Sequence, residues 1–343
     1  MTEAVVIPAA ARARGLWPAL WPVLCVVALA LLPLVLPGRF WLHILSLTMI
    51  YAIFTLGQNV VTGWAGMLTL GQAAFVGMGA YTSVLLTMEL GLPWPLACLA
   101  AGLVSGLCGA LLSIPCLRVK ADFLSLVTIA FNQIFFVVAN NWMDLTRGPM
   151  GIPAVPAMGA FGWIARTPAQ QFWLILGVAA LLFLLIGRLT RGPIGRAWKM
   201  IRDDEIAAGA LGVNVTAYKV LAFGVGCFLC GLGGGVYAHY MRFVSPDMFK
   251  LEESLLMMQM AILGGLASMP GTALGAFLMI AIPEALRSSE PWLITARPGI
   301  AGAMLVVMMI FRPNGLLGMG ETHPLFLKLR AAVLGARDGR ARR

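Results

Sequence analysis

Long runs of apolar residues separated by short polar segments make up most of this chain. Ten runs carry Asp, Glu, Lys or Arg only near their ends, and they cover residues 16–36, 41–60, 67–88, 93–115, 123–142, 171–187, 217–240, 254–269, 271–286 and 298–311. A helix needs about 20 apolar residues to cross the hydrocarbon core of a bilayer. The pattern therefore predicts an all-α, polytopic membrane protein of about ten transmembrane helices.

Two parts of this pattern are interrupted by glycine. The eighth and ninth runs are about 16 residues each and meet at the glycine-rich stretch 263–275, so they are either two spans or a re-entrant pair. Irregular backbone is tolerated at membrane depth only where protein or water satisfies its polar groups. A second interrupted stretch occupies residues 57–66 and continues into the small residues of 70–81. Paired interruptions in two halves of a membrane protein indicate a transport site.

The composition excludes a water-soluble globule and several kinds of catalytic site. Of 343 residues, 60% are apolar and 11% are charged, against about 25% charged in soluble domains. The pair Cys227 and Cys230 lacks a second cysteine pair or a nearby histidine, so we predict no metal site. None of the five lysines follows a glycine, which excludes a P-loop, so the chain is expected to bind no nucleotide cofactor of its own.

The net charge of +10 is explained by topology rather than by nucleic acid. If every run crosses the membrane, 17 of the 24 Lys and Arg residues fall on the side of the N-terminus. Basic residues accumulate in cytoplasmic loops, which places both termini in the cytoplasm. The expected organisation is a cytoplasmic N-terminus at 1–15, a transmembrane domain at 16–318 and a basic cytoplasmic tail at 319–343.

The longest cytoplasmic segment, residues 188–216, contains a predicted helix. Its acidic residues 203–205 suit a first helical turn, where carboxylates favour the helix dipole. Residues 207–211 continue the helix, and Gly212 is suited to stop it in the left-handed conformation. Two interpretations remain open from the residues alone. The segment is either a helix that docks a partner or an amphipathic connector with Trp198 in the lipid headgroups.

The uncharged interiors of the runs bear on the source of energy. A proton-coupled carrier usually holds a titratable group at membrane depth, whereas here Glu89, Glu284 and His239 lie only near predicted ends. A secondary carrier is therefore disfavoured. An intramembrane enzyme would need a nucleophile with a base, or paired carboxylates, on facing helices, and the sequence offers neither convincingly. These observations favour an ATP-hydrolysing partner that docks on residues 191–212 of the cytoplasmic segment.

Several segments together resemble a known family. They are residues 57–81, 148–153, 195–212, 218–223, 243–247, 262–277 and 311–318, and they recur in family order from about residue 40 to 318. The chain resembles the LivM-type permease subunits of branched-chain amino acid ABC importers, which lie in the bacterial inner membrane. The resemblance implies a transporter subunit rather than an enzyme.

The resemblance also implies partners and a substrate class. A second, LivH-type permease subunit would complete the path in the lipid bilayer, and two ABC ATPase subunits would use ATP and Mg. An extracytoplasmic binding protein would deliver leucine, isoleucine or valine. Related permeases carry urea, short amides or small organic acids, so these solutes are the alternative substrates.

Two groups of residues follow as candidate sites. The ATPase coupling helix implied by the family matches Arg202, Asp203, Asp204, Glu205, Ala208, Leu211 and Gly212. The sequence departs from the family at Gly209, which is expected to loosen this helix by about 1 kcal/mol relative to alanine. The expected substrate pathway comprises Gln58, Asn59, Gly66, Gly71, Gln72, Phe75, Gly77, Gly79, Gly264, Gly265 and Gly271. Helix ends at the glycine breaks are expected to receive the substrate carboxylate, and Phe75 the side chain.

Overall fold

The structure is a computed structural model that describes residues 38–117, 121–160, 163–286 and several positions between 299 and 317. The predicted first span at 16–36, the N-terminal segment 1–15 and the tail 319–343 lie outside the described residues, as does most of the predicted run 298–311.

Helices account for most of the described chain. The first half contains α2 (Arg39–Asn59), the π-helix η1 (Val60–Trp64), α3 (Gln72–Glu89), α4 (Trp94–Cys116), α5 (Ala121–Asn141), α6 (Met143–Thr146), η2 (Gly148–Met150), β1 (Ile152–Pro153), β2 (Gly159–Ala160) and β3 (Trp163–Ile164). The second half contains α7 (Pro168–Arg191), α8 (Pro193–Asp203), α9 (Glu205–Ala210), α10 (Val215–Met241), β4 (Phe243–Val244), η3 (Pro246–Phe249), α11 (Leu251–Gly264) and α12 (Met269–Leu286).

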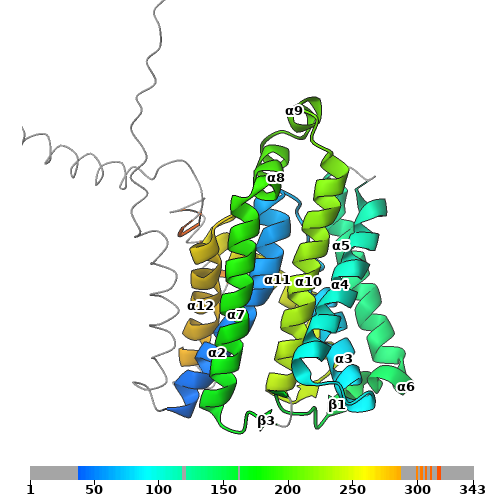
Figure 1. Cartoon of the computed structure of the whole chain (residues 1–343), viewed down its shortest axis with the longest axis vertical. Helices are drawn as coiled ribbons and strands as arrows, with labels where there is room; N and C mark the ends of the chain where they lie inside the picture. Colours follow the sequence, from blue (N-terminus) through cyan, green and yellow to red (C-terminus); the bar gives the residue numbers. More distant parts are fainter. Residues whose placement is uncertain are drawn as a thin grey trace, which may run out of the picture.

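The long helices lie side by side in one bundle (Figure 1). Helices α8 and α9 lie at one end, which we call the α9 end, and α6, β1 and β3 lie at the opposite end. Each strand has two residues, and they pair antiparallel as β1 with β4 and β2 with β3. These short pairs leave the described bundle helical, as the sequence predicts.

Five helical segments of the described chain are long and apolar enough to cross a membrane. They are residues 39–64, which combine α2 with η1, together with α4, residues 123–141 of α5, α7 and α10. This confirms a polytopic helical membrane protein. The predicted run 67–88 starts too early, because Gly66 takes a φ of +73° and the helix α3 begins only at Gln72.

The eighth and ninth predicted runs, 254–269 and 271–286, form a helical hairpin. Helices α11 and α12 pack antiparallel, and an added Cβ at Gly264 would lie 2.0 Å from the carbonyl oxygen of Gly271. Helix α11 has 14 residues, or about 21 Å of rise, which is less than a bilayer core of about 30 Å. The chain turns between the helices at residues 265–268, where Gly265 has a φ of +114° and Ala267 a φ of +58°.

Helices α2 and α10 occupy the centre of the described bundle. In their most apolar windows, 78% and 72% of residues are buried, against 28–39% in α4, α5 and α7. Small residues allow this packing, since an added Cβ at Gly79 of α3 would lie 2.1 Å from the carbonyl oxygen of Gly231 of α10. The outer helices instead expose leucines, such as Leu99, Leu103 and Leu107 of α4. This exposed apolar face suits contact with lipid.

Candidate functional site

The polar segment at the α9 end is anchored to the bundle by α8. An added Cβ at Gly195 would lie 1.9 Å from the carbonyl oxygen of Thr190, so only glycine fits this turn from α7 into α8. Trp198 is fully buried, and its Nε1 donates to the carbonyl oxygen of Tyr218 at 2.8 Å. The connector interpretation that placed Trp198 in the lipid headgroups is therefore wrong on this point.

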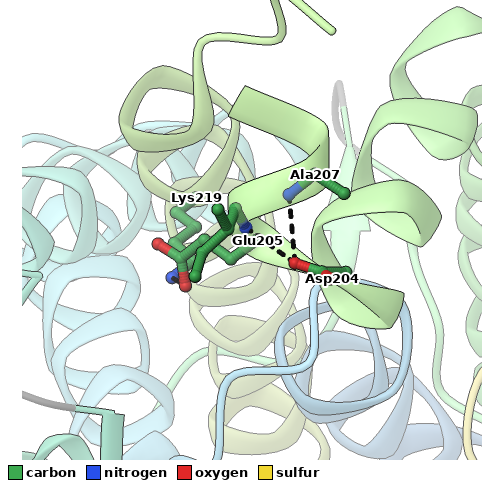
Figure 2. Close-up of polar contacts among 5 residues, drawn as sticks. Asp204, Glu205, Ala207 and Lys219 are labelled. Atoms are coloured by element: carbon green, nitrogen blue, oxygen red, sulfur yellow. Dashed lines mark hydrogen bonds and ion pairs between the residues drawn. The ribbon is translucent and has the colours of Figure 1, made fainter. Parts of the chain in front are cut away.

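The helical backbone is interrupted at Asp204, between α8 and α9. Asp204 is extended, with φ −159° and ψ 111°, and its side chain accepts from the amides of Ile206 at 2.9 Å and Ala207 at 3.0 Å (Figure 2). The prediction that residues 203–205 share one helical turn is thus wrong, because Asp203 is the last residue of α8 and Asp204 is the N-cap. A capping residue needs non-helical backbone, so a strong cap inside an acidic run divides the helix there.

Helix α9 is short, and both of its ends are defined by specific residues. Glu205, its first residue, forms an ion pair with Lys219 near the start of α10 (Figure 2). The predicted stop is confirmed, since Gly212 has a φ of +84° just beyond the helix. Gly209 has no steric need to be glycine, because its nearest neighbour would lie 4.0 Å from an added Cβ, at Val215.

Two apolar side chains project from this end of the molecule. Ile206 is 86% exposed and Leu211 is 73% exposed, whereas Ala208 between them is 2% exposed. We call Ile206 and Leu211 the α9 tip. Exposed apolar surface on a polar segment is available for contact with another protein or with the membrane surface.

Arg202, the second-last residue of α8, contacts both its neighbour and the bundle. Its side chain is 28% exposed, and its Nη2 lies 3.6 Å from Oδ1 of Asp203. Its Nη1 donates to the carbonyl oxygen of Gly63 at 2.9 Å. Gly66, with its left-handed φ, lies against the same side chain, because an added Cβ would be 2.7 Å from Cγ of Arg202. Sequence reasoning grouped Arg202 with the coupling helix; the structure adds its contact with η1, and its role toward a partner stays a prediction.

The predicted pathway residues fall into separate groups. Asn59 reaches the α11–α12 turn, where its Oδ1 accepts from the amide of Ala267 at 2.9 Å and its Nδ2 donates to Oγ1 of Thr272 at 2.7 Å. Gly264, Gly265 and Gly271 form this turn and the adjoining helix contact. Gln58 is directed elsewhere, and its Nε2 donates to the carbonyl oxygen of Thr69 at 2.8 Å.

A second group surrounds the start of α3. Gly71 precedes the helix and lies against Thr128 of α5, and Gln72 is fully buried with Oε1 3.8 Å from Sγ of Cys227. Phe75 is 1% exposed and stacks on Phe131, with ring centroids 5.2 Å apart.

The two remaining glycines of α3 serve helix packing. Gly77 lies against Phe135 and Phe249, and Gly79 lies against Gly231. A solute contact for any member of the pathway set stays a prediction.

Other residues line two surface hollows in the described part of the chain. A cavity of about 380 Å³ is lined by Arg39, Leu42, His43, Ser46, Pro168, Gln171, Tyr240 and Met241. A second, of about 350 Å³, is lined by Gln133, Phe136, Lys250, Leu251, Glu252 and Leu255. The predicted pathway residues belong to neither cavity, because in this chain they fill contacts between helices.

Sequence reasoning missed a carboxylate in the bundle. Helix α11 begins at Leu251, three residues before the predicted run, so Glu253 lies in its first turn. The Oε2 of Glu253 accepts from the hydroxyl of Tyr51 on α2 at 3.1 Å. Paired acidic residues after Lys250 are typical of a helix start, and they could have indicated this earlier boundary.

The bundle of membrane-length apolar helices defines the chain as a multi-pass membrane protein. Residues 40–313 match the family described as branched-chain amino acid transport system / permease component, and the chain belongs to this family. The resemblance inferred from the sequence is thereby confirmed.

Known relatives agree with this family. The chain is 36% identical to the high-affinity branched-chain amino acid transport system permease protein LivM of Salmonella typhimurium, over 86% of this chain and 73% of that protein. It is 35% identical to the protein of the same name in Escherichia coli, over 90% of this chain and 77% of the relative. A probable LivM of Methanocaldococcus jannaschii is 22% identical over 65% of this chain and 67% of its own. No solved structure matches the chain.

Proposed function

We propose that this chain is the membrane-spanning permease subunit of an ATP-driven importer for leucine, isoleucine and valine. The observation that carries the proposal is family membership over residues 40–313, together with relatives named as high-affinity branched-chain amino acid permeases. An extracytoplasmic binding protein delivers the substrate, and a second permease subunit of the LivH type completes the path through the bilayer.

The proposed topology has ten spans, with both termini in the cytoplasm of a bacterium and the bundle in its inner membrane. The described chain starts at Gly38, at the end opposite to α9 (Figure 1). Near the other terminus, Leu316 lies beside the α11–α12 turn, because its amide donates to the carbonyl oxygen of Leu263. One span before Gly38 and one before Leu316 then bring both termini to the α9 end. Arginine is abundant there, at positions such as Arg188, Arg191 and Arg196, which favours a cytoplasmic location.

Helix α9 is the proposed coupling helix, on which one of two ABC ATPase subunits docks. Its exposed tip, Ile206 and Leu211, supplies apolar contact area, and the Asp204 cap holds the helix in shape. ATP and Mg are bound by the ATPase subunits. This division of labour is consistent with a sequence that lacks a P-loop.

Substrate passage is proposed at the interrupted helices. The π-helix η1 and the α11–α12 turn lie beside each other, and both leave backbone groups outside regular α-helical bonding. Rocking of the two permease subunits would expose these breaks alternately to each side, and helix ends there would receive the substrate carboxylate. In this proposal Gln58, Asn59 and Gln72 border the path.

The substrate class is tested by competition in the assembled importer. We expect vesicles that contain both permease subunits and the ATPase subunits to accumulate labelled leucine when ATP and the binding protein are present. Excess unlabelled isoleucine or valine should suppress most of this uptake, because the three side chains are apolar and similar in size. Excess urea or acetamide is the matched control and should leave uptake unchanged. Competition by urea or acetamide, without competition by valine, would favour the related permeases of other small solutes.

A further inference from the structure

Three segments that are distant in sequence converge on Gly63. Its carbonyl oxygen accepts from Nη1 of Arg202 at the end of α8. An added Cβ at Gly63 would lie 1.9 Å from Oδ1 of Asn59 and 2.5 Å from the amide nitrogen of Ala267. Gly63 therefore contacts the cytoplasmic segment on one side and the α11–α12 turn on the other, and no side chain fits between them.

Asn59 fixes the turn of the hairpin from inside the bundle. It is fully buried, and it satisfies the amide of Ala267 at a position where φ is +58°. It also donates to Oγ1 of Thr272 at 2.7 Å, in the first turns of α12. A buried amide in such a turn needs a partner, so the position of Asn59 and the shape of the turn are linked.

The backbone between these two contacts is a π-helix. Residues 60–64 bond in the π pattern, with the amide of Ala65 donating to the carbonyl oxygen of Val60 at 3.2 Å. π-helical turns are rare and often lie at functional sites. Here the π turn is the last turn after α2, and the chain leaves the helix beyond Trp64. A π turn can convert to regular α-helical bonding, so this end of the helix can move when one of its contacts moves.

We propose that Gly63, held between Arg202 and Asn59, is a joint that transmits movement of α8 and α9 to the α11–α12 hairpin. Arg202 is a positioning residue in this scheme, because its guanidinium donates to the carbonyl oxygen of Gly63. The proposal rests on the proposed function, since it connects the ATPase-docking segment to the helix break at which substrate passes.

The test uses the full complex with its partner subunits and two measurements. The first is the ratio of labelled leucine taken up to ATP hydrolysed. The second is hydrogen exchange in the peptide covering residues 265–268, with and without ATP bound to the ATPase subunits. The variants are Arg202→Ala, Arg202→Lys, Asn59→Ala and the double alanine variant. Arg196→Ala, which removes an exposed arginine from the same helix, is the matched control.

We expect Arg202→Ala and Asn59→Ala each to lower the transport ratio by about tenfold, within the usual range of coupling between sites. The double variant should lose no more than either single variant, because both act through one joint. Arg202→Lys keeps a donor for the Gly63 carbonyl and should recover much of the ratio. ATP should alter exchange at 265–268 in the unmodified protein and in Arg196→Ala, but not in Arg202→Ala. If Asn59→Ala fails to assemble, Thr272→Val removes one Asn59 contact with little change of shape.

The outcomes separate the joint from the proposed function. The joint would be refuted by an unchanged ratio of leucine uptake to ATP hydrolysis in Arg202→Ala. It would also be refuted if the effects of the two single variants multiplied in the double variant. Neither result would contradict the proposed importer function. Loss of the ATPase subunits from Arg202→Ala would also refute it, because the arginine would then act at the docking surface. Absence of leucine uptake in the unmodified complex would reject the substrate, while the exchange measurement would still decide the joint. An unmodified chain that binds no ATPase would reject both.

Discussion

Replacing Gly79 with alanine is expected to destabilise the protein strongly, whereas the same change at Gly177 is expected to be harmless. The added Cβ at Gly79 would lie 2.1 Å from the carbonyl oxygen and 2.4 Å from Cα of Gly231. Both are backbone atoms of α10, so no side-chain rotation relieves the clash and the two helices must separate. Alanine gains about 1 kcal/mol in helix propensity over glycine, but overpacking of this kind costs about 3 kcal/mol. The net effect is a destabilisation of about 2 kcal/mol, with α3 and α10 held further apart.

Gly177 provides the matched control within a helix of the same protein. It is exposed in α7 and has no atom within 4 Å of an added Cβ. Thermal unfolding in detergent should show a lower Tm and a lower yield for Gly79→Ala, and an unchanged or higher Tm for Gly177→Ala. Equal Tm values for the two variants would mean that α3 and α10 do not approach as closely as described.

Introducing charge at the α9 tip is expected to abolish ATP-driven uptake. Ile206→Asp combined with Leu211→Asp places two carboxylates where we propose that apolar side chains, 86% and 73% exposed, dock on the ATPase. If each side chain contributes about 1.4 kcal/mol to binding, the pair weakens association by about 100-fold. The bundle itself should fold normally, because neither side chain packs into it.

The measurement is the amount of ATPase subunit that co-purifies with the chain. The variant Ile206→Leu with Leu211→Ile keeps the tip apolar and should retain the partner. The double aspartate variant should lose the partner and, with it, leucine uptake. Full retention of the ATPase in the aspartate variant would favour the alternative in which residues 188–216 only connect two spans.

The lengths of the apolar runs predicted the main helices well, because the thickness of a bilayer sets the length of a spanning helix. The run 93–115 became α4 at Trp94–Cys116, and the run 217–240 became α10 at Val215–Met241. The start of α3 was missed because the residues before Gln72 are apolar in composition, yet Gly66 turns the chain out of the helix. Apolar composition indicates that a segment lies in the membrane, but it does not show where the backbone leaves the helix.

Contacts between distant segments could not be inferred from the sequence. Asn59 was selected as a pathway residue because it neighbours glycines, but its partner Ala267 lies 208 positions away. The direction of Arg202 was likewise hidden, since an arginine beside Asp203 and Asp204 suits a surface helix equally well. The π-helix at residues 60–64 gives no periodic pattern of its own because all of these residues are buried.

The central claim is that this chain forms the route for the solute, while partner subunits supply the energy for its transport. Uptake into vesicles tests this claim most directly. Labelled leucine is offered to vesicles that contain the chain alone and to vesicles that contain the complete complex, each with and without ATP, and with the binding protein outside. The account predicts accumulation against a gradient only for the complete complex with ATP. Accumulation of leucine by the chain alone would contradict it.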